Sequence, residues 1–365
     1  MKKIKVYLQY PWKFPDSPYY KYLLQEHPKE IEYLNVEKQK GVITNKKFFW
    51  FSNFLKRNIR RTFNLFKFSI PNAHNSPDGN YDLIHCAHCL SKNKNKSWVC
   101  DIESEWQLYV GNKNKFVKKK VERILKRDNC KKILPWTQFT ANEIIKEYPS
   151  IKDKIEVVYP AIPVVKNLNR KKEKEIILLF IGRYFYWKGG LYALEVMDRL
   201  TKKYKTVKAI CVSEVPEEVK EKYSSNKKIK IYGLMSQEKV FEIYNQSNIF
   251  IYPGFSDSFG FGFLEAMNFG LPIITIDNGG CRREILEDKK TGFISMLNKE
   301  LNENLIKKID NEIINSLVKN TSKLIEDNKL RNKMSKECLK IIKEGKFSIK
   351  ERNKKMKKIY EEALK

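Results

Sequence analysis

Short apolar runs alternate with amphipathic segments through the second half of the chain. Runs rich in Ile, Val and Phe are typical of strands buried on both faces of a parallel sheet, and apolar residues spaced by three or four indicate helices. The pattern predicts strands at 175–181, 207–212, 228–231, 248–252 and 272–276. Helices are predicted at 191–204, from 216, at 237–246 and at 260–269. This alternation is typical of a doubly wound α/β domain.

The first 165 residues repeat the alternation more faintly. Strands are predicted at 3–9, 82–86, 98–101, 132–135 and 155–158, with a helix at 140–148. Because ligands of open parallel sheets bind outside the carboxyl ends of the strands, we expect two Rossmann-like domains that face each other across one cleft. The charged segment 169–174, NRKKEK, is the expected linker, which gives a first domain of residues 1–168 and a second of residues 169–345.

Composition excludes several classes of protein. Of the 365 residues, 42% are hydrophobic and 13% are aromatic, which is ordinary for a globular chain and excludes global disorder. The apolar runs are far shorter than the roughly 20 residues that span a bilayer. The amino terminus, MKKIKVYLQYPW, is typical of a first strand rather than of a signal peptide, so we expect a cytoplasmic protein.

Charge is the first unusual feature of the chain. The excess of 72 Lys and Arg residues over 43 Asp and Glu residues gives a net charge of +29, which favours polyanions such as nucleic acid, anionic membranes or nucleotide phosphates. Residues 46–70 hold seven basic side chains, no acidic ones and eight aromatics, in a pattern typical of an interfacial helix. Residues 112–132 and 346–365 are also basic. For each segment the alternative is an ordinary helix with a solvated lysine face.

Cysteine spacing predicts neither a disulfide framework nor a metal site. The seven cysteines are scattered and odd in number, which fits a reducing compartment. Cys86 and Cys89, with His85 and His88, resemble half of a zinc site, but no second pair follows at ligand spacing. Buried cysteines at a strand end are the favoured interpretation, and no metal is expected.

Two segments place phosphate-binding chemistry at predicted strand ends. The first, FIGRYFYWKGG, follows strand 175–181 and contains Gly182, Arg183 and Lys188. Glycine lets the backbone approach a ligand, while arginine and lysine offer a planar fork and a point charge to phosphate oxygens. The spacing differs from that of a Walker P-loop, because no Gly directly precedes the lysine and no Ser or Thr follows it.

The second segment is PGFSDSFGFGFLEAMNFG at 253–270. Asp257 lies in its loop, and the amides around 258–262 begin a helix whose amino terminus suits diphosphate or sugar oxygens. Glu265 lies within that helix, and eight helical residues would separate it from Asp257 by roughly 12 Å. Glycosidase carboxyls lie about 5 to 9.5 Å apart, so a hydrolase pair is disfavoured. The two acids suit two hydroxyl-rich parts of one extended ligand with a diphosphate between them.

Residues 177–294 resemble the donor half of family-4 glycosyltransferases, which are retaining enzymes of the GT-B fold that use nucleotide sugars. GRYFYWKG resembles the family's Gly-Arg and Lys-Gly motif, and DSFGFGFLE resembles its two acids separated by seven residues. The resemblance implies that Glu265 holds the ribose and that Asp257, where the family usually has Glu, lies near the transferred sugar. Gly233, in IYGLMSQEKV, falls in the segment that carries the base. The segment 280–284, in DNGGCRREILEDKKTGFI, is one residue longer than usual.

The resemblance implies further properties. The fold would be α/β, of the GT-B class, with the carboxyl-terminal helix 347–364 packed back on the first domain. The donor would be a UDP- or GDP-sugar, with no obligatory cofactor or divalent metal. The leaving phosphate itself would help to take the acceptor proton on the same face of the sugar.

The first domain departs from the family's pattern. QYPWKFPDSPY at 9–19 replaces the family's Gly-Gly loop. Where many members have a histidine near the reacting sugar, this chain reads WVCDIESEW, which makes Asp101 or Glu103 the acceptor-side candidate. His85, at the end of another strand, is a further candidate contact, with a purely structural histidine as the alternative.

The sequence therefore predicts a retaining, hexosyltransferase-type enzyme in which Arg183, Lys188 and Asp257 are catalytic. The predicted donor-binding residues are Gly182, Ser258, Phe259, Gly260, Phe261, Gly262, Glu265 and Gly233. The acceptor is expected to be a hydroxyl of a lipid-linked or cell-surface glycan, with residues 46–70 on the anionic inner face of a membrane. The alternatives are a GT-B epimerase or phosphorylase, and, from a different class, a basic protein that binds membranes or nucleic acid. Nucleic acid is not expected, because no recognition module appears.

Overall fold

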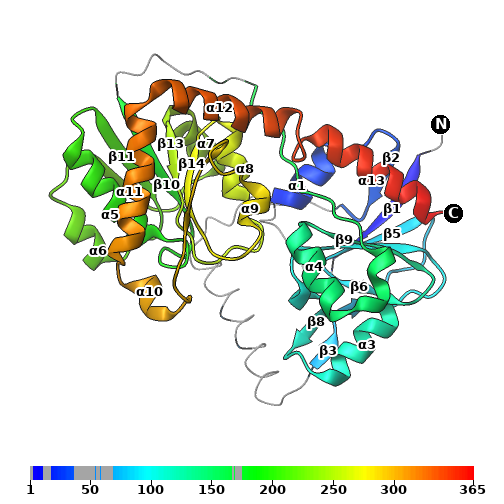
Figure 1. Ribbon diagram of the computed structural model, residues 1–365. Helices are drawn as coiled ribbons and strands as arrows, with labels where there is room; N and C mark the ends of the chain where they lie inside the picture. Colours follow the sequence, from blue (N-terminus) through cyan, green and yellow to red (C-terminus); the bar gives the residue numbers. More distant parts are fainter. Residues whose placement is uncertain are drawn as a thin grey trace. The chain divides into compact units, whose positions relative to one another are not determined.

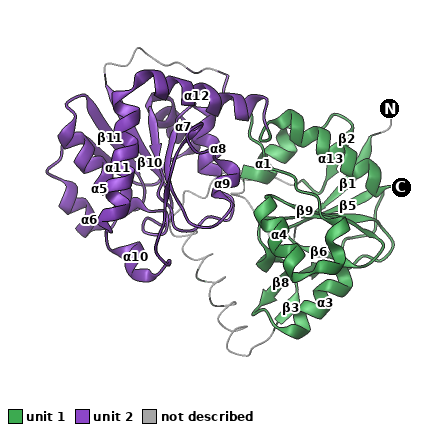
Figure 2. Cartoon of the chain, in the orientation of Figure 1, with its two compact units in different colours: residues 1–163, 346–365 green, residues 164–345 purple. Residues whose placement is uncertain are grey.

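The computed structural model describes residues 3–10, 18–36, 69–166 and 175–365, together with the single residues 54, 58 and 168 (Figure 1). The amphipathic segment 46–70 lies almost entirely outside these residues, as does the expected linker 169–174. The chain divides into two compact units (Figure 2). Unit 1 comprises residues 1–163 and 346–365, and unit 2 comprises residues 164–345.

Unit 1 is built on a parallel sheet with the strand order β2-β1-β5-β7-β9. Its strands are β1 (Ile4–Gln9), β2 (Ile31–Leu34), β5 (Leu83–Ala87), β7 (Trp98–Ile102) and β9 (Cys130–Pro135). Numbered along the chain, this is the 2-1-3-4-5 order of flavodoxin-like folds, in which the order reverses between the first and third strands. Every residue of β5 and β7 is buried, as expected for parallel strands covered on both faces.

Helices and short strands complete unit 1. The helices are α1 (Pro18–Gln25), α3 (Lys115–Leu125), α4 (Gln138–Glu147), α13 (Ile349–Ala363) and the 3₁₀ turns η1 (Glu105–Leu108) and η2 (Pro149–Lys154). The short strands are β3 (Ser69–Pro71) paired with β8 (Tyr109–Gly111), and β4 (Ala73–His74) paired with β6 (Leu90–Ser91).

The carboxyl-terminal helix α13 belongs to unit 1 although the intervening 182 residues form unit 2. Arg352 donates to the carbonyl of Glu26 at 2.7 Å, and the hydroxyls of Tyr360 and Tyr33 lie 2.8 Å apart. Ser348 caps the first turn by accepting from the amide of Glu351. Both ends of the chain therefore contribute to one core.

Unit 2 contains a second parallel sheet, with the order β12-β11-β10-β13-β14-β15. Its strands are β10 (Ile176–Ile181), β11 (Val207–Val212), β12 (Ile229–Tyr232), β13 (Ile249–Ile251), β14 (Ile273–Asp277) and β15 (Gly292–Met296). Numbered along the chain, this is the 3-2-1-4-5-6 order of the Rossmann fold, whose ligand crevice opens where the order reverses between β10 and β13.

The helices of unit 2 follow its strands in alternation. They are α5 (Gly190–Lys203), α6 (Glu217–Tyr223), α7 (Gln237–Gln246), α8 (Phe261–Asn268), α9 (Arg282–Ile285), α10 (Glu303–Lys307), α11 (Asn311–Glu326) and α12 (Asn328–Lys343). α5 buries an apolar stripe that includes Leu194, Met197 and Leu200. α8 is largely buried, which fits its apolar sequence FGFLEAMN. Within the described ranges, none of the helices combines the length and apolar composition needed to cross a bilayer.

The strands predicted in the second half of the chain agree with β10 to β14 to within one or two residues at each end. The predicted strand 155–158 is wrong in the described chain: the segment follows β9 through an isolated bridge from Ile155 to Ile133 and through the amides of Glu156 and Val158, but it does not form a strand. Strand β2, helix α1 and strand β15 are present but were not predicted. They are short, so their periodicity is weak.

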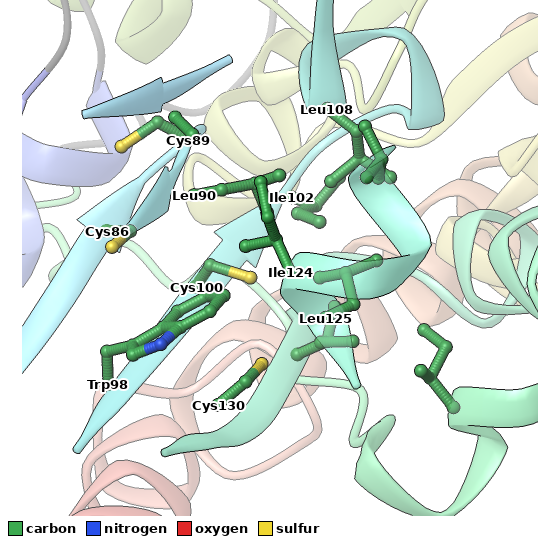
Figure 3. Close-up of a cluster of buried hydrophobic side chains, with 14 of the residues drawn as sticks. Cys86, Cys89, Leu90, Trp98, Cys100, Ile102, Leu108, Ile124, Leu125 and Cys130 are labelled. Carbon is green, nitrogen blue, oxygen red and sulfur yellow. The ribbon is translucent and has the colours of Figure 1, made fainter. Parts of the chain in front are cut away.

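Four of the cysteines lie in the hydrophobic core of unit 1, around Trp98 (Figure 3). These are Cys86, Cys89, Cys100 and Cys130. All seven cysteines of the chain are buried free thiols. Burial raises the pKa of Cys130 to about 12, and it raises the pKa of Cys86 and of Cys100 well above the ordinary value of a thiol. All four side chains pack as small hydrophobic groups, and at neutral pH Cys86, Cys100 and Cys130 do not form the reactive thiolate.

Candidate functional site

Two loops meet at the carboxyl edge of the unit 2 sheet, where the strand order reverses. One loop, 182–189, follows β10, and the other, 252–260, follows β13. The amide of Phe255 donates to the carbonyl of Trp187 at 2.9 Å. The ammonium of Lys188 donates to the carbonyl of Ser256 at 2.8 Å. The structure thus brings together the two segments that the sequence assigned to phosphate binding.

Glycines allow this close approach. Gly189 has φ +74°, and a Cβ at this position would lie 2.1 Å from the carbonyl oxygen of Pro253. At Gly182 a Cβ would lie 2.9 Å from the Cβ of Lys188. Any larger residue would push the loops apart, so these glycines set the position of Lys188.

Asp257 lies at the centre of a charged cluster between the loops. Its Oδ1 atom accepts from Lys188 at 2.5 Å and from the Tyr252 hydroxyl at 3.0 Å. Its Oδ2 atom accepts from Nη2 of Arg282 at 3.0 Å. The Asp257 side chain is 6% exposed, that of Lys188 is 22% exposed and that of Arg282 is 2% exposed. Burial, and then the Asp257 charge, raise the pKa of Tyr252 well above its ordinary value, so Tyr252 remains a neutral donor.

Arg282 is a member of this cluster that sequence reasoning missed. It opens α9, and its Nη1 atom donates to the carbonyls of Gly254 at 2.8 Å and Ile276 at 2.6 Å. A fully buried guanidinium is rare unless it is paired. The available signal was the segment 280–284, which contains CRRE and is one residue longer than the resemblance implies.

Helix α8 begins beside this cluster. Gly260 occupies its N-cap with φ +92°, and a Cβ there would lie 2.8 Å from the Phe263 ring. Ser258 is exposed, while Phe261 and Gly262 are half-buried. Glu265 is also half-buried and accepts from the Tyr244 hydroxyl at 3.3 Å. Burial, and then Glu265, raise the pKa of Tyr244 well above its ordinary value.

The other predicted donor residues are placed differently. The Phe259 side chain is fully buried and lies 5.1 Å, between ring centroids, from Phe261. The side chain of Phe259 therefore belongs to the core, and the prediction that Phe259 binds the donor concerns its backbone amide. Arg183 is half-buried in the loop after β10. Gly233 follows β12, which β11 separates from β10, so it lies away from the Asp257 cluster along the sheet edge.

In unit 1, two acceptor-side candidates form a buried network. Asp101 and His85 have no exposed surface, and His85 Nε2 lies 3.2 Å from Asp101 Oδ1. Tyr20 donates to Asp101 at 2.8 Å and the indole of Trp136 donates at 3.2 Å. The other nitrogen of His85 lies 2.6 Å from the hydroxyl of Tyr360 on α13. A hydrogen-bonded chain therefore links the carboxyl-terminal helix to the centre of the sheet.

This burial corrects the acceptor-side assignment of Asp101 and His85. Burial alone would raise the pKa of Asp101, but His88, His85 and Tyr20 together outweigh it and hold the pKa below its ordinary value. Asp101 is therefore a buried carboxylate that holds neighbouring elements. Glu103, just beyond β7, is half-buried and stays a candidate acceptor contact.

His88 is a second residue whose placement was not foreseen. It follows β5, where the order of the unit 1 sheet reverses, and it has φ +52°. Its ring lies 4.9 Å from Trp136 and 5.3 Å from Tyr20, between ring centroids. The sequence placed it only in an incomplete zinc motif. In the part of the chain that the structure describes, no three His, Cys, Asp or Glu side chains are grouped so that they could hold a metal ion.

Comparison with known proteins relates much of the second half of the chain to one family. Residues 163–340 match the family model described as "Glycosyl transferases group 1". A probable sucrose-phosphate synthase of Thermosipho melanesiensis is 26% identical over 198 residues, which cover 48% of this chain and 44% of that protein. The GPI3 subunit of a phosphatidylinositol N-acetylglucosaminyltransferase from Saccharomyces cerevisiae is 23% identical over 37% of this chain and 30% of its own length. The chain thus spans less than half the length of these curated relatives.

Solved structures confirm the predicted GT-B fold class. A glycosyltransferase from Rickettsia africae superimposes with a TM-score of 0.64 at 18% identity, over 100% of this chain and 99% of that chain. The pneumococcal O-GlcNAc transferase GtfA, solved with UDP and GlcNAc, gives a TM-score of 0.57 at 15% identity, over 77% and 57% of the two chains. At these identities the likeness concerns the fold.

Proposed function

We propose that this chain, whose residues 163–340 belong to the group 1 glycosyltransferase family, transfers a hexose from a UDP- or GDP-sugar to an acceptor hydroxyl with retention of configuration. The observation that carries the proposal is the cluster of Lys188, Asp257 and Arg282 beside the amino terminus of α8. It lies at the carboxyl edge of a Rossmann-type sheet, where such sheets bind nucleotides.

The proposed chemistry follows from the charges of this cluster. Negative charge develops on the diphosphate as the sugar leaves, and the Lys188 ammonium and the Arg183 guanidinium stabilise it. The first amides of α8 add donors and the positive end of a helix dipole. Because the developing charge is larger in the transition state than in the bound donor, these contacts raise kcat as well as affinity. The leaving phosphate then takes the acceptor proton on the same face.

Glu265 provides the test of the donor site. Its half-buried carboxylate, held by Tyr244, suits the two ribose hydroxyls. Since a hydrogen bond to a charged group contributes about 1.5 to 3 kcal/mol, Glu265→Ala is expected to weaken the preferred donor roughly ten- to a hundred-fold. Calorimetric titration of UDP-, GDP- and ADP-sugars into both proteins measures this change. Glu242→Ala, an exposed glutamate on the neighbouring helix α7, is the control.

The result also separates the alternatives. Failure of every nucleotide sugar to bind the wild-type chain would reject the proposed function. Conversion of the donor without any acceptor would indicate an epimerase, and dependence on inorganic phosphate would indicate a phosphorylase. Equal donor affinity in the wild type and Glu265→Ala would remove Glu265 from the site while leaving the transferase proposal in place.

We also propose that the acceptor is lipid-linked and that the enzyme works on an anionic membrane surface. The expectation rested on residues 46–70, which lie almost entirely outside the described residues, but α3 offers independent support. Lys119, Lys120 and Arg123 are exposed on α3, and Phe116 beside them is 63% exposed with the Lys120 ammonium 4.1 Å from its ring centroid. Basic side chains around one exposed aromatic suit an anionic interface. The S. cerevisiae relative is itself named for a phosphatidylinositol acceptor.

Vesicle flotation tests the membrane proposal. Each basic side chain near an anionic surface contributes about 1 kcal/mol, so the double variant Lys119→Glu/Lys120→Glu is expected to bind phosphatidylserine vesicles roughly tenfold or more weakly than the wild type. Lys329→Glu/Lys333→Glu makes the same change of charge on exposed positions of α12 and is the control. Equal loss in both variants would show a diffuse charge effect, and no binding by the wild type at low salt would reject the membrane proposal.

A further inference from the structure

Two cations share the carboxylate of Asp257, and their surroundings differ. Arg282 is 2% exposed and donates to three acceptors: Asp257, the Gly254 carbonyl and the Ile276 carbonyl. Its guanidinium carbon also lies 5.4 Å from the centroid of the Phe263 ring, at the start of α8. One side chain therefore joins the loop after β13, the end of β14 and the first turn of α8.

Lys188 is held less firmly. Its side chain is 22% exposed, and its ammonium donates to Asp257 and to the Ser256 carbonyl, which belong to the same loop. A lysine stem is flexible and its ammonium re-forms hydrogen bonds in many directions. If Arg282 turned away it would leave two buried carbonyls unpaired, whereas Lys188 turns at little cost. Lys188 is thus the exchangeable partner of Asp257 and Arg282 is the permanent one.

We propose that Arg282 is a positioning residue of the donor site: it neutralises Asp257 permanently, so that Lys188 is shared between Asp257 and the donor diphosphate. This inference rests on the proposed function. It also explains two departures of the sequence together. Asp257 is one methylene shorter than the glutamate that the resemblance implies, and Arg282 lies in the segment 280–284, which is one residue longer than the resemblance implies.

The inference predicts a rescue. In Arg282→Met, Lys188 is the remaining cation on Asp257, so a diphosphate must compete with the full carboxylate charge for Lys188. The affinity for the nucleoside diphosphate is then expected to fall by about tenfold or more. The double variant Asp257→Asn/Arg282→Met removes that competing charge, and its affinity should return to within about threefold of the wild type. A purely structural arginine predicts no such recovery, since removal of a second polar group does not repair a lost scaffold.

The experiment is calorimetric titration of UDP and of GDP into wild type, Arg282→Met, Asp257→Asn/Arg282→Met and Arg282→Lys, with circular dichroism as the check of folding. Arg282→Lys keeps the charge and is expected to bind the nucleoside diphosphate more tightly than Arg282→Met. If Arg282→Met does not fold, the double variant is compared with the wild type and with Arg282→Lys. Arg283→Met, which changes the exposed neighbouring arginine paired with Asp277, is the matched control. Affinity recovered in the double variant supports the inference.

Three results would overturn it. Wild-type affinity in Arg282→Met would show that Lys188 needs no second counter-ion. A folded double variant that still binds the nucleoside diphosphate about tenfold or more weakly than the wild type would assign Arg282 a scaffold role alone. If the wild-type chain bound neither UDP nor GDP, the proposed function itself would fail, and this inference with it.

Discussion

Replacing Lys188 by methionine is expected to lower kcat for sugar transfer by roughly 100- to 1,000-fold, the range seen when one preorganised donor to a developing anion is removed. Methionine keeps much of the stem that packs over Gly182 but removes the ammonium that lies 2.5 Å from Asp257 and 2.8 Å from the Ser256 carbonyl. Since Asp257 retains Arg282 and Tyr252, the charged cluster stays paired and the fold should be preserved. Initial rates at saturating donor measure the effect.

Lys202→Met is the control for this prediction. Lys202 is an exposed lysine of α5 that pairs with Asp198 one turn away, an interaction expected to contribute only about 0.3 to 0.5 kcal/mol. Its variant should transfer sugar at the wild-type rate. If Lys188→Met also kept the wild-type rate, Lys188 would have no part in stabilising the leaving diphosphate, and its position against Asp257 would be structural.

The sheet of unit 2 could be predicted from sequence because each strand is short, apolar and separated from the next by an amphipathic helix. β10, β11 and β14 are recognisable from these runs alone. Parallel strands buried on both faces carry the strongest hydrophobic signal that a sheet can give. The loops that follow them were also predictable in kind, since Gly189 and Gly260 do adopt the positive φ angles that glycine favours.

The partners inside the site could not be predicted, because they come from positions far apart in the sequence. Arg282 reaches Asp257 across 25 residues, and Tyr360 reaches His85 across 275 residues. Local patterns carry no information about such contacts. In the sequence, Arg282 next to Arg283 resembles two ordinary solvent-exposed arginines. The same reason explains the error at Asp101 and His85: strand-end polar residues are usually exposed, but here α1 and α13 bring hydroxyl groups that form hydrogen bonds with them and allow them to be buried.

Asp101→Asn is expected to lower the free energy of unfolding by about 2 to 4 kcal/mol at neutral pH, because it removes a fully buried charge that accepts from Tyr20 and Trp136 and pairs with His85. The effect depends on pH with a definite sign. The pKa of Asp101 in the folded chain lies below the ordinary value of 3.8, so the unfolded chain takes up the proton first as the pH falls. The carboxylate's contribution is therefore complete above that ordinary value and is lost as the pH falls through the lower, folded pKa.

Urea unfolding of the wild type and of Asp101→Asn at a series of pH values measures this dependence, with the midpoint and slope analysed at each pH. Asp153→Asn changes an exposed aspartate of the same unit and is the control. Its urea midpoint should equal that of the wild type at every pH. A stability difference that stays constant as the pH falls would assign the loss to side-chain packing and not to the buried charge. A difference that narrows only at the acid end would show that the ionised carboxylate itself holds α1, β5 and, through His85 and Tyr360, the carboxyl-terminal helix in one core.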